Sequence, residues 1–223
     1  AKSKQDKPAR QPRAEGAGKF DLNPSDEQEM LIEAFGEFAK AELLPIATKS
    51  SNDCKTPDEV LKASTELGVT MIGVPEELGG AVEQRSAVTS ALISEALAKG
   101  DLGMAVAVLA PAAVSTAIGL WGSGEQQAKY LPEFVGDDVP AAALAVMEPK
   151  PMFDPFRLQT KANKNSDGSY TLTGVKNLVP RAAEAELFVI AADLAGEPRM
   201  FIVESKYNGI SVTPEPAMGI RPA

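Results

Sequence analysis

Residues 140–147 read PAAALAVM, and the pattern of the sequence changes at this stretch. Before it, apolar residues recur every three or four positions between capping residues, which is typical of helices. After it, short apolar or alternating runs are separated by turn-forming residues, which is typical of strands. A block of helices followed by a block of strands indicates an α+β fold rather than a βαβ sheet.

Five helical segments are expected before residue 140. Two of them open with a serine and a glutamine three residues apart, which is the spacing of a capping box. Thr56 is the predicted N-cap of another helix, and Pro45 is expected to end or kink the first one. Pro111 is expected to break the most apolar segment into two short buried helices. The segments are 25–46, 56–67, 86–99, 102–121 and 123–134.

Seven short strands are expected from residue 141 onward. The sequence NSDG at 165–168 has strong turn chemistry and separates two alternating runs. The expected strands are 141–147, 158–164, 169–173, 175–179, 187–192, 200–204 and 210–213. The sequence therefore predicts two domains, an all-α domain at 23–139 and an antiparallel β-barrel or sandwich domain at 140–223.

The composition limits the chemistry that the chain can support. It has 223 residues, a formal net charge of −9, no histidine and one cysteine. These counts exclude histidine-dependent catalysis, disulfide frameworks and metal sites built from histidine or several cysteines. The acidic balance argues against nucleic acid as a partner. No apolar run reaches the roughly 18 residues that a membrane span requires, so no span is expected.

The first 22 residues differ in composition from the rest. Residues 1–19 carry six Lys or Arg residues against two acidic ones, a charge of +4, so the remainder carries −13. Such a basic segment with few apolar residues buries too little surface to offset the entropy of ordering it. Residues 1–22 are therefore predicted to form a solvated tail, with packing on another subunit as the alternative.

Several residues invite a functional interpretation but have a simpler one. Glu76 and Glu77 are adjacent acids in a Pro/Gly-rich turn and are expected to face solvent. Trp121 is expected to pack beside the start of a helix, with cofactor stacking as the alternative. Cys54 precedes a predicted helix, but the sequence implies no basic partner for it, so it is expected to be unreactive.

Four stretches, taken in order, resemble one protein family. They are SDEQEML at 25–31 with FA at 38–39 and LPIA at 44–47, GVPEELGG at 73–80, GSGEQQ at 122–127 with KYLP at 129–132, and MEP at 147–149 with DGSYTLTGVK at 167–176 and AELF at 185–188. Together they are similar to the acyl-CoA dehydrogenase family over about residues 23–221.

The resemblance implies a fold and an activity. The family has an N-terminal helical domain, a middle β domain and a C-terminal four-helix domain, and the first two agree with the α-then-β order. Its members remove the α proton of an acyl-CoA thioester with a carboxylate and pass the β hydrogen to FAD as hydride. The resemblance thus implies FAD as cofactor, acyl-CoA as substrate and homo- or hetero-oligomers with family members. It implies a cytoplasmic location, or the mitochondrial matrix in a eukaryote.

The family's catalytic base is a glutamate of the C-terminal domain, so no residue here inherits that role. MGIR at 218–221 resembles the turn before the last strand of the family's middle domain. We therefore expect this chain to be part of a longer polypeptide, with an incomplete β domain and no activity by itself.

The cofactor-contact motifs differ from the family pattern. Residues 147–154, MEPKPMFD, stand where the family has TEPGAGSD, and residues 178–182, LVPRA, stand where it has WITNG. At least three hydrogen-bond donors are lost, at a cost of roughly 1.5–4.5 kcal/mol in cofactor affinity. By correspondence, the expected cofactor contacts are Ala145, Met147, Glu148, Phe153, Leu178, Val179 and Pro180, and the expected substrate contacts are Phe153 and Asp154.

Two interpretations stay open at this point. In the first, the protein is a divergent FAD-dependent acyl-CoA dehydrogenase. In the second, it is a flavin-poor, inactive member of the family that serves as a structural or acyl-CoA-binding subunit. Lys150 and Arg181, which are new charges in the two motifs, are interpreted as surface residues, with anion binding as the alternative.

Overall fold

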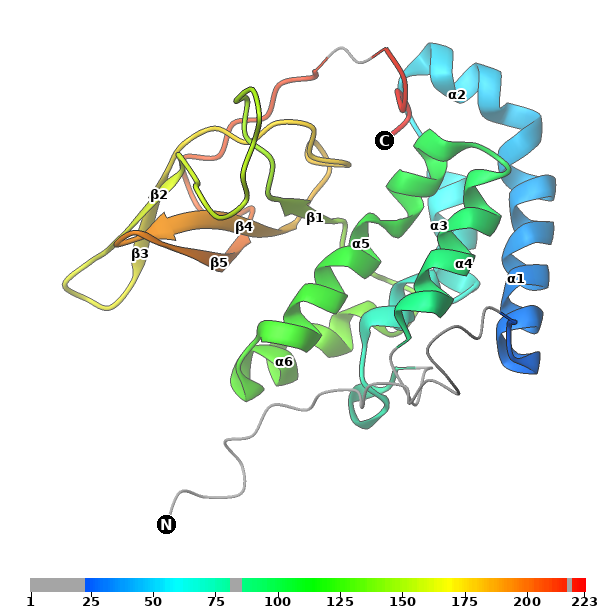
Figure 1. Cartoon of the computed structure of the whole chain (residues 1–223), viewed down its shortest axis with the longest axis horizontal. Coiled ribbons are helices and arrows are strands. Elements are labelled where there is room, and N and C mark those ends of the chain that lie inside the picture. The colour runs from blue at the N-terminus through cyan, green and yellow to red at the C-terminus, as the bar shows by residue number, and fades with distance from the viewer. Residues whose placement is uncertain (1–22, 81–85, 216–217) are drawn as a thin grey trace. The chain divides into compact units, whose positions relative to one another are not determined.

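The computed structural model describes residues 23–80, 86–215 and 218–223 (Figure 1). The predicted tail at 1–22 lies outside the described residues. The chain divides into a helical unit, which comprises the described residues up to Val139 together with residues 218–223, and a β unit, Pro140–Glu215. The sequence predicts that all of 140–223 belongs to the β domain, whereas the described residues 218–223 group with the helices.

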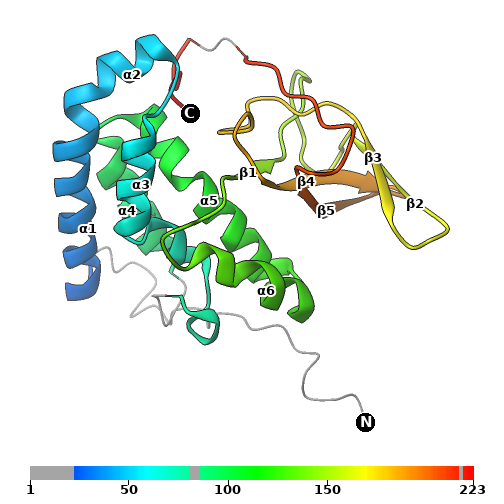
Figure 2. The same cartoon turned by 180° about the vertical axis from the view of Figure 1, so that it is seen from behind.

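The helical unit contains the expected helices with changed boundaries, together with one helix, α2 (Ala47–Asp53), that the sequence does not predict. In the described residues they are α1 (Asp26–Phe38), α2 (Ala47–Asp53), α3 (Asp58–Glu66), α4 (Ala87–Ala98), α5 (Leu102–Trp121) and α6 (Gly124–Tyr130). α1 packs against α4, and α4 packs against α5, as both views show (Figures 1 and 2). Their shared core includes Phe35, Leu43, Ile93, Leu97 and Met104.

Both predicted capping boxes are confirmed. At the start of α1, the Ser25 hydroxyl accepts from the Gln28 N–H at 3.3 Å and the Gln28 side chain accepts from the Ser25 N–H at 3.0 Å. Ser123 and Gln126 make the same two bonds at the start of α6, at 3.2 and 2.9 Å. Each box satisfies two backbone donors that a helix leaves unpaired at its N-terminus.

The predicted helix 25–46 is α1 followed by irregular helical turns. α1 ends at Phe38, a π-helical turn covers Ala39–Leu43, and a 3₁₀ turn covers Leu44–Ile46. Pro45 lies at the start of that last turn, where its missing N–H leaves no bond unmade. The path then continues into α2, so Pro45 lies in an irregular turn between α1 and α2 and does not end the helical segment.

The prediction of two short helices at 102–121 is wrong. α5 is one helix of 20 residues with Pro111 buried inside it. A proline in a helix interior costs roughly 3 kcal/mol, and the burial of most of the apolar residues of α5 outweighs that cost. The expectation that no apolar run reaches the length of a membrane span is wrong, since the length and composition of α5 would suffice to cross a membrane. However, 72% of its most apolar window is buried within the protein, which is typical of a core helix.

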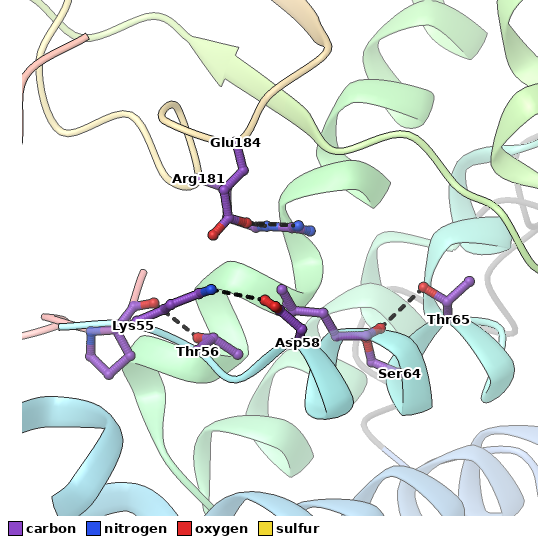
Figure 3. A network of polar contacts seen from close by, with 9 residues as sticks. Lys55, Thr56, Asp58, Ser64, Thr65, Arg181 and Glu184 are labelled. Carbon is purple, nitrogen blue, oxygen red and sulfur yellow. Dashed lines mark hydrogen bonds and ion pairs between the residues drawn. The ribbon is translucent and has the colours of Figure 1, made fainter. Parts of the chain in front are cut away.

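The start of α3 also differs from the prediction. Pro57, not Thr56, is the N-cap of α3, and it makes no side-chain capping bond. The Thr56 hydroxyl instead donates to the Pro222 carbonyl at 2.9 Å (Figure 3). One residue along, Arg221 donates to the Cys54 sulfur at 3.1 Å, which gives Cys54 a basic neighbour that the sequence does not reveal. These contacts hold the C-terminal residues on the helical unit.

Two of the simpler interpretations have a clear outcome in the structure. Glu76 and Glu77 are exposed in their turn, as predicted. Trp121 is 67% exposed at the end of α5, just before the start of α6, so most of its side chain is not packed against the protein as predicted.

The β unit is a mixed sheet rather than a wholly antiparallel one. In the described residues its strands are β1 (Ala142–Ala145), β2 (Lys161–Lys164), β3 (Tyr170–Thr173), β4 (Leu187–Leu194) and β5 (Glu197–Glu204). β4 is central: β1 and β2 pair with it in parallel, and β5 pairs with it antiparallel from Leu187↔Glu204 to Leu194↔Glu197. β2 and β3 form the predicted hairpin around residues 165–168. The α+β class is confirmed.

The predicted strands 175–179 and 210–213 do not form. The first segment is held by isolated bonds to the end of β1 rather than by a ladder. The second is exposed and is followed by Pro214, and no described strand pairs with it.

Candidate functional site

The predicted cofactor contacts lie mostly on two loops of the β unit. The first loop, residues 147–154, follows β1, and the second loop, residues 176–182, precedes β4. A buried ion pair joins them, because Lys176 Nζ lies 2.9 Å from Glu148 Oε1. The side chains are 10% and 1% exposed, respectively. Lys176 Nζ also donates to the Val146 carbonyl at 3.1 Å.

The Glu148 carboxylate is fully engaged. It accepts from the backbone N–H of Gln159 at 2.6 Å and of Thr160 at 2.8 Å, in addition to the Lys176 ammonium. Burial by itself would raise the pKa of this carboxyl, but the hydrogen bonds from Gln159, Thr160 and Lys176 outweigh it and lower the pKa to about 2. Burial lowers the pKa of Lys176, and Glu148 offsets part of that effect. The pair is therefore ionised at neutral pH.

A backbone bond reinforces the junction between the loops. The Asn177 N–H donates to the Met147 carbonyl at 3.1 Å. The side-chain oxygen of Asn177 is buried and has no hydrogen-bond partner among the described residues. It is a spare acceptor beside the ion pair, where a donor from a ligand or a water would satisfy it.

The structure separates the predicted cofactor contacts into two groups. Ala145 is buried in β1, Glu148 is buried in the ion pair, and Val179 packs on the small core around Phe188. These three side chains build the scaffold. The side chains of Met147 and Leu178 are exposed, and those of Phe153 and Pro180 are half-buried, so these four can meet a ligand.

Both loops contain non-glycine residues in the left-handed backbone region. Met152 has φ +54, Leu178 has φ +50 and Arg181 has φ +55. This conformation costs an L-residue roughly 1–2 kcal/mol, and such strain clusters at ligand sites. Met152 stands where the family motif has glycine, so the loop keeps a glycine-like path with a methionine in place.

The second loop has local partners for two of its polar groups. The Leu178 N–H donates to the Glu215 carboxylate at 3.0 Å. Arg181 Nη2 lies 3.1 Å from Glu184 Oε2, an ion pair drawn in Figure 3. Arg181 is therefore a locally paired charge in this structure.

An open depression of about 530 Å³ lies next to the first loop. Three cationic side chains, Lys150, Arg157 and Lys161, line it with the exposed ring of Phe156 and a single carboxylate, Asp193. Lys161 Nζ lies 3.2 Å from Asp193 Oδ1. The predicted substrate residue Asp154 shapes the rim, since its carboxylate accepts from the Phe156 N–H at 2.9 Å and lies 3.6 Å from Arg157.

Family models match both parts of the chain. The acyl-CoA dehydrogenase N-terminal domain matches residues 25–138, and the acyl-CoA dehydrogenase middle domain matches residues 143–223. The chain belongs to the acyl-CoA dehydrogenase family. The family expected from the four sequence stretches is thereby confirmed.

Relatives within the acyl-CoA dehydrogenase family agree in sequence and fold. The chain is 30% identical over 204 residues to the mitochondrial short/branched chain specific acyl-CoA dehydrogenase of Bos taurus, covering 88% of this chain and 46% of that protein. It is 33% identical to an acyl-CoA dehydrogenase of Bacillus anthracis solved with FAD, with a TM-score of 0.75 over 90% of this chain and 35% of that one. Butyryl-CoA dehydrogenase of Megasphaera elsdenii gives 26% identity and a TM-score of 0.79, over 91% of this chain and 55% of that one. The chain thus spans about a third to a half of these relatives.

FAD is the cofactor that the acyl-CoA dehydrogenase family implies. The backbone course of the two loops fits it, but their hydrogen-bonding groups fit it only in part. The left-handed backbone at Met152 keeps the course of a glycine loop, and Asn177 offers a buried acceptor. Met147 and Pro180 carry no hydroxyl, and Pro151 and Pro180 have no N–H. The loops therefore offer apolar contact and backbone groups rather than side-chain donors.

The sequence identifies Glu148 as a cofactor contact but does not reveal that it joins the loops. Lys176 enters only as the last residue of a family motif, and a strand is predicted for the segment that contains Gln159 and Thr160. The family motifs MEP and GVK contain Glu148 and Lys176, respectively. Because these two residues lie 28 positions apart, no local periodicity of the sequence reveals that their side chains pair. Within residues 23–80, 86–215 and 218–223, no three His, Cys, Asp or Glu side chains gather where they could hold a metal ion.

Proposed function

We propose that this chain forms the helical and middle parts of an FAD-dependent acyl-CoA dehydrogenase that oxidises the α,β bond of acyl-CoA thioesters. The observation that carries the proposal is the match of both family domains in the right order. FAD supplies the redox chemistry when it is bound. The two loops of the β unit supply contact surface for it through Met147, Phe153, Leu178 and Pro180.

The chain by itself is proposed to be inactive. Removal of an α proton needs a carboxylate whose pKa is close enough to neutrality for it to act as a base. Among the described residues the buried carboxylate is Glu148, which has a pKa of about 2 and is neutralised by Lys176. An acid held in this way is a poor base. We expect the base to come from a domain of the family that the matches do not include.

A flavin absorption spectrum and a turnover assay test this proposal. Purified protein should retain the yellow cofactor or take it up from added FAD, with absorption maxima shifted from those of free FAD. Acyl-CoA-dependent dye reduction should be absent for residues 1–223 alone. Dye reduction by this chain would overturn the statement on inactivity, and a protein that FAD does not reconstitute would overturn the statement on the cofactor.

One observation favours a second candidate function. The side-chain donors of the family motifs are replaced together, and the Leu178 N–H is already engaged by the Glu215 carboxylate. The protein would then be a flavin-poor subunit that serves a structural or acyl-CoA-binding role beside an active relative. Colourless protein that still binds an acyl-CoA would support this function over the first.

Both functions share a proposed site for the coenzyme A part of the substrate. The depression has three cations against one carboxylate, and the ring of Phe156 is 77% exposed at its edge. Phosphate groups favour Lys and Arg partners, and an adenine ring stacks on aromatic faces. We propose that the phosphates and adenine of coenzyme A bind there, with Asp154 holding the rim and Phe153 beside it.

Calorimetric titration with coenzyme A tests this site. The variant Lys150→Ala/Arg157→Ala should bind at least tenfold more weakly than the unmodified chain, and binding should weaken as salt is added. Lys164→Ala is the matched control, because Lys164 is an exposed cation of β2 that does not line the depression. Equal affinity in the double variant and the control would refute the placement.

The location and assembly of the whole protein follow the same proposal. We infer a cytoplasmic protein, or a matrix protein in a eukaryote, which is compatible with the mitochondrial relative from Bos taurus. We also infer homo- or hetero-oligomers with family members. Size-exclusion chromatography with light scattering on the complete polypeptide tests the assembly.

A further inference from the structure

We propose that Lys176 is a positioning residue for the candidate cofactor site, acting through Glu148 to set the distance between the two loops. This inference rests on the proposed function, since the two loops are cofactor contacts only under that proposal. Its physical basis is a set of four bonds that converge on one buried pair. No other buried ion pair of Lys or Arg with Asp or Glu is present among the described residues.

The bonds link three segments that are distant in sequence. Lys176 reaches Val146 and Glu148 at the start of the first loop, at 3.1 and 2.9 Å. Glu148 reaches the backbone of Gln159 and Thr160 ahead of β2, at 2.6 and 2.8 Å. The Lys176 ammonium thereby fixes the start of the second loop relative to both other segments.

The position of Lys176 confines the effect of losing its ammonium to the candidate cofactor site. The next residue, Asn177, donates its N–H to Met147, and Leu178 follows with a left-handed backbone. The exposed side chains of Met147 and Leu178 thus lie one and two residues from the pair. Loss of the ammonium would leave a buried carboxylate without its counter-charge and would release the Val146 carbonyl, so the loops would separate.

Amide hydrogen exchange measured by NMR tests the proposal on the 223-residue chain. The main variant is Glu148→Gln/Lys176→Met, which removes both charges and keeps the side-chain lengths, so that no unpaired buried charge unfolds the unit. Lys176→Arg is the conservative variant. Lys164→Met is the control, since it removes an exposed cation of β2 in the same unit that lies outside both loops and outside the depression.

In the double variant, exchange of the Asn177 N–H should accelerate at least tenfold relative to the amides of β4 and β5. The Thr160 N–H should stay protected, because the amide oxygen of the glutamine introduced by Glu148→Gln can still accept from it. In Lys176→Arg the exchange rate of Asn177 should stay within threefold of the unmodified chain, and Lys164→Met should leave it unchanged. A uniform acceleration across the β unit, or an Asn177 rate within threefold of the unmodified chain in the double variant, would overturn the positioning role.

An FAD titration of the same proteins connects the pair to the site. If the unmodified chain binds FAD, the double variant should bind at least tenfold more weakly while Lys164→Met binds normally, and equal affinity would overturn the link. If the unmodified chain does not bind FAD, the proposed cofactor fails, and the exchange of Asn177 still decides whether Lys176 positions the loops. The two failures are therefore distinguishable.

Discussion

Acidification should destabilise the β unit through one carboxylate, Glu148. Its pKa is lowered from an ordinary value of 4.5 to about 2 in the folded chain. Between these two values the unfolded chain binds a proton that the folded chain does not. The stability that Glu148 contributes is therefore fully present above pH 4.5 and is lost as the pH falls toward 2.

The size of the effect follows from the shift. A difference of 4.5 minus about 2, or about 2.5 units, corresponds to about 3 kcal/mol, at about 1.4 kcal/mol per unit. The side chain is 1% exposed, so solvent screening does not reduce this figure substantially. Between pH 5 and pH 3 the expected loss is about 2 kcal/mol. Lys176 remains protonated in both states over this range and adds nothing to the slope.

Urea unfolding at pH 6, 5, 4 and 3 measures the loss, with circular dichroism of the β unit as the signal. Other carboxylates titrate in the same range, so the informative quantity is the difference between the unmodified chain and Glu148→Gln. That difference should shrink by about 2 kcal/mol between pH 5 and pH 3.

The control is Asp167→Asn. Asp167 also has a lowered pKa, because Ser169 donates two hydrogen bonds to it, but it is an exposed turn residue and should contribute little. Parallel curves for the unmodified chain and Glu148→Gln would refute the reasoning from the buried pair.

Three glycine-related substitutions give further tests by chemical denaturation. Met152→Gly should stabilise the β unit by about 0.5–1 kcal/mol, because Met152 is 95% exposed with φ +54 and loses no burial; Met152→Ala, which keeps the Cβ, should give no gain. Gly36→Ala should stabilise α1 by about 0.8–1 kcal/mol, since a Cβ there meets no atom within 4 Å. Gly73→Ala should destabilise the helical unit by about 1–3 kcal/mol, because its Cβ would lie 2.4 Å from Ser115 Oγ. A sign opposite to the one stated would refute each prediction.

The features that sequence predicted well are those decided within a few residues. Ser25 and Gln28 need only each other to close a capping box, so their spacing is sufficient evidence. The turn at 165–168 is similar, since Gly168 takes φ +87 and its N–H bonds back to Asn165. Chemistry of this kind is local, and the sequence displays it directly.

The features that sequence predicted badly depend on distant partners. Pro111 would break an isolated helix, but α5 is buried on almost every side and continues through it. The segment 175–179 has the apolar pattern of a strand, yet its bonds go to single groups at the end of β1. Thr56 has the sequence position of an N-cap, and the Pro222 carbonyl takes its hydroxyl instead. In each case tertiary contacts decide between alternatives that are locally close in energy.

The loops of the β unit show which part of a family site is set by the scaffold. The family motif has glycine at the position of Met152, and Met152, Leu178 and Arg181 all take left-handed backbone here at a cost of roughly 1–2 kcal/mol each. Something outside these residues must impose the path, and the Lys176–Glu148 pair with its backbone bonds is the buried structure next to both loops. The substitutions therefore change what the loops offer to a ligand more than where the loops run. The chain can therefore keep the acyl-CoA dehydrogenase fold while its hydrogen-bond donors depart from the family pattern. Mutations of the loop side chains should mainly change ligand affinity, whereas mutations of the Lys176–Glu148 pair should also change the position of the loop backbone.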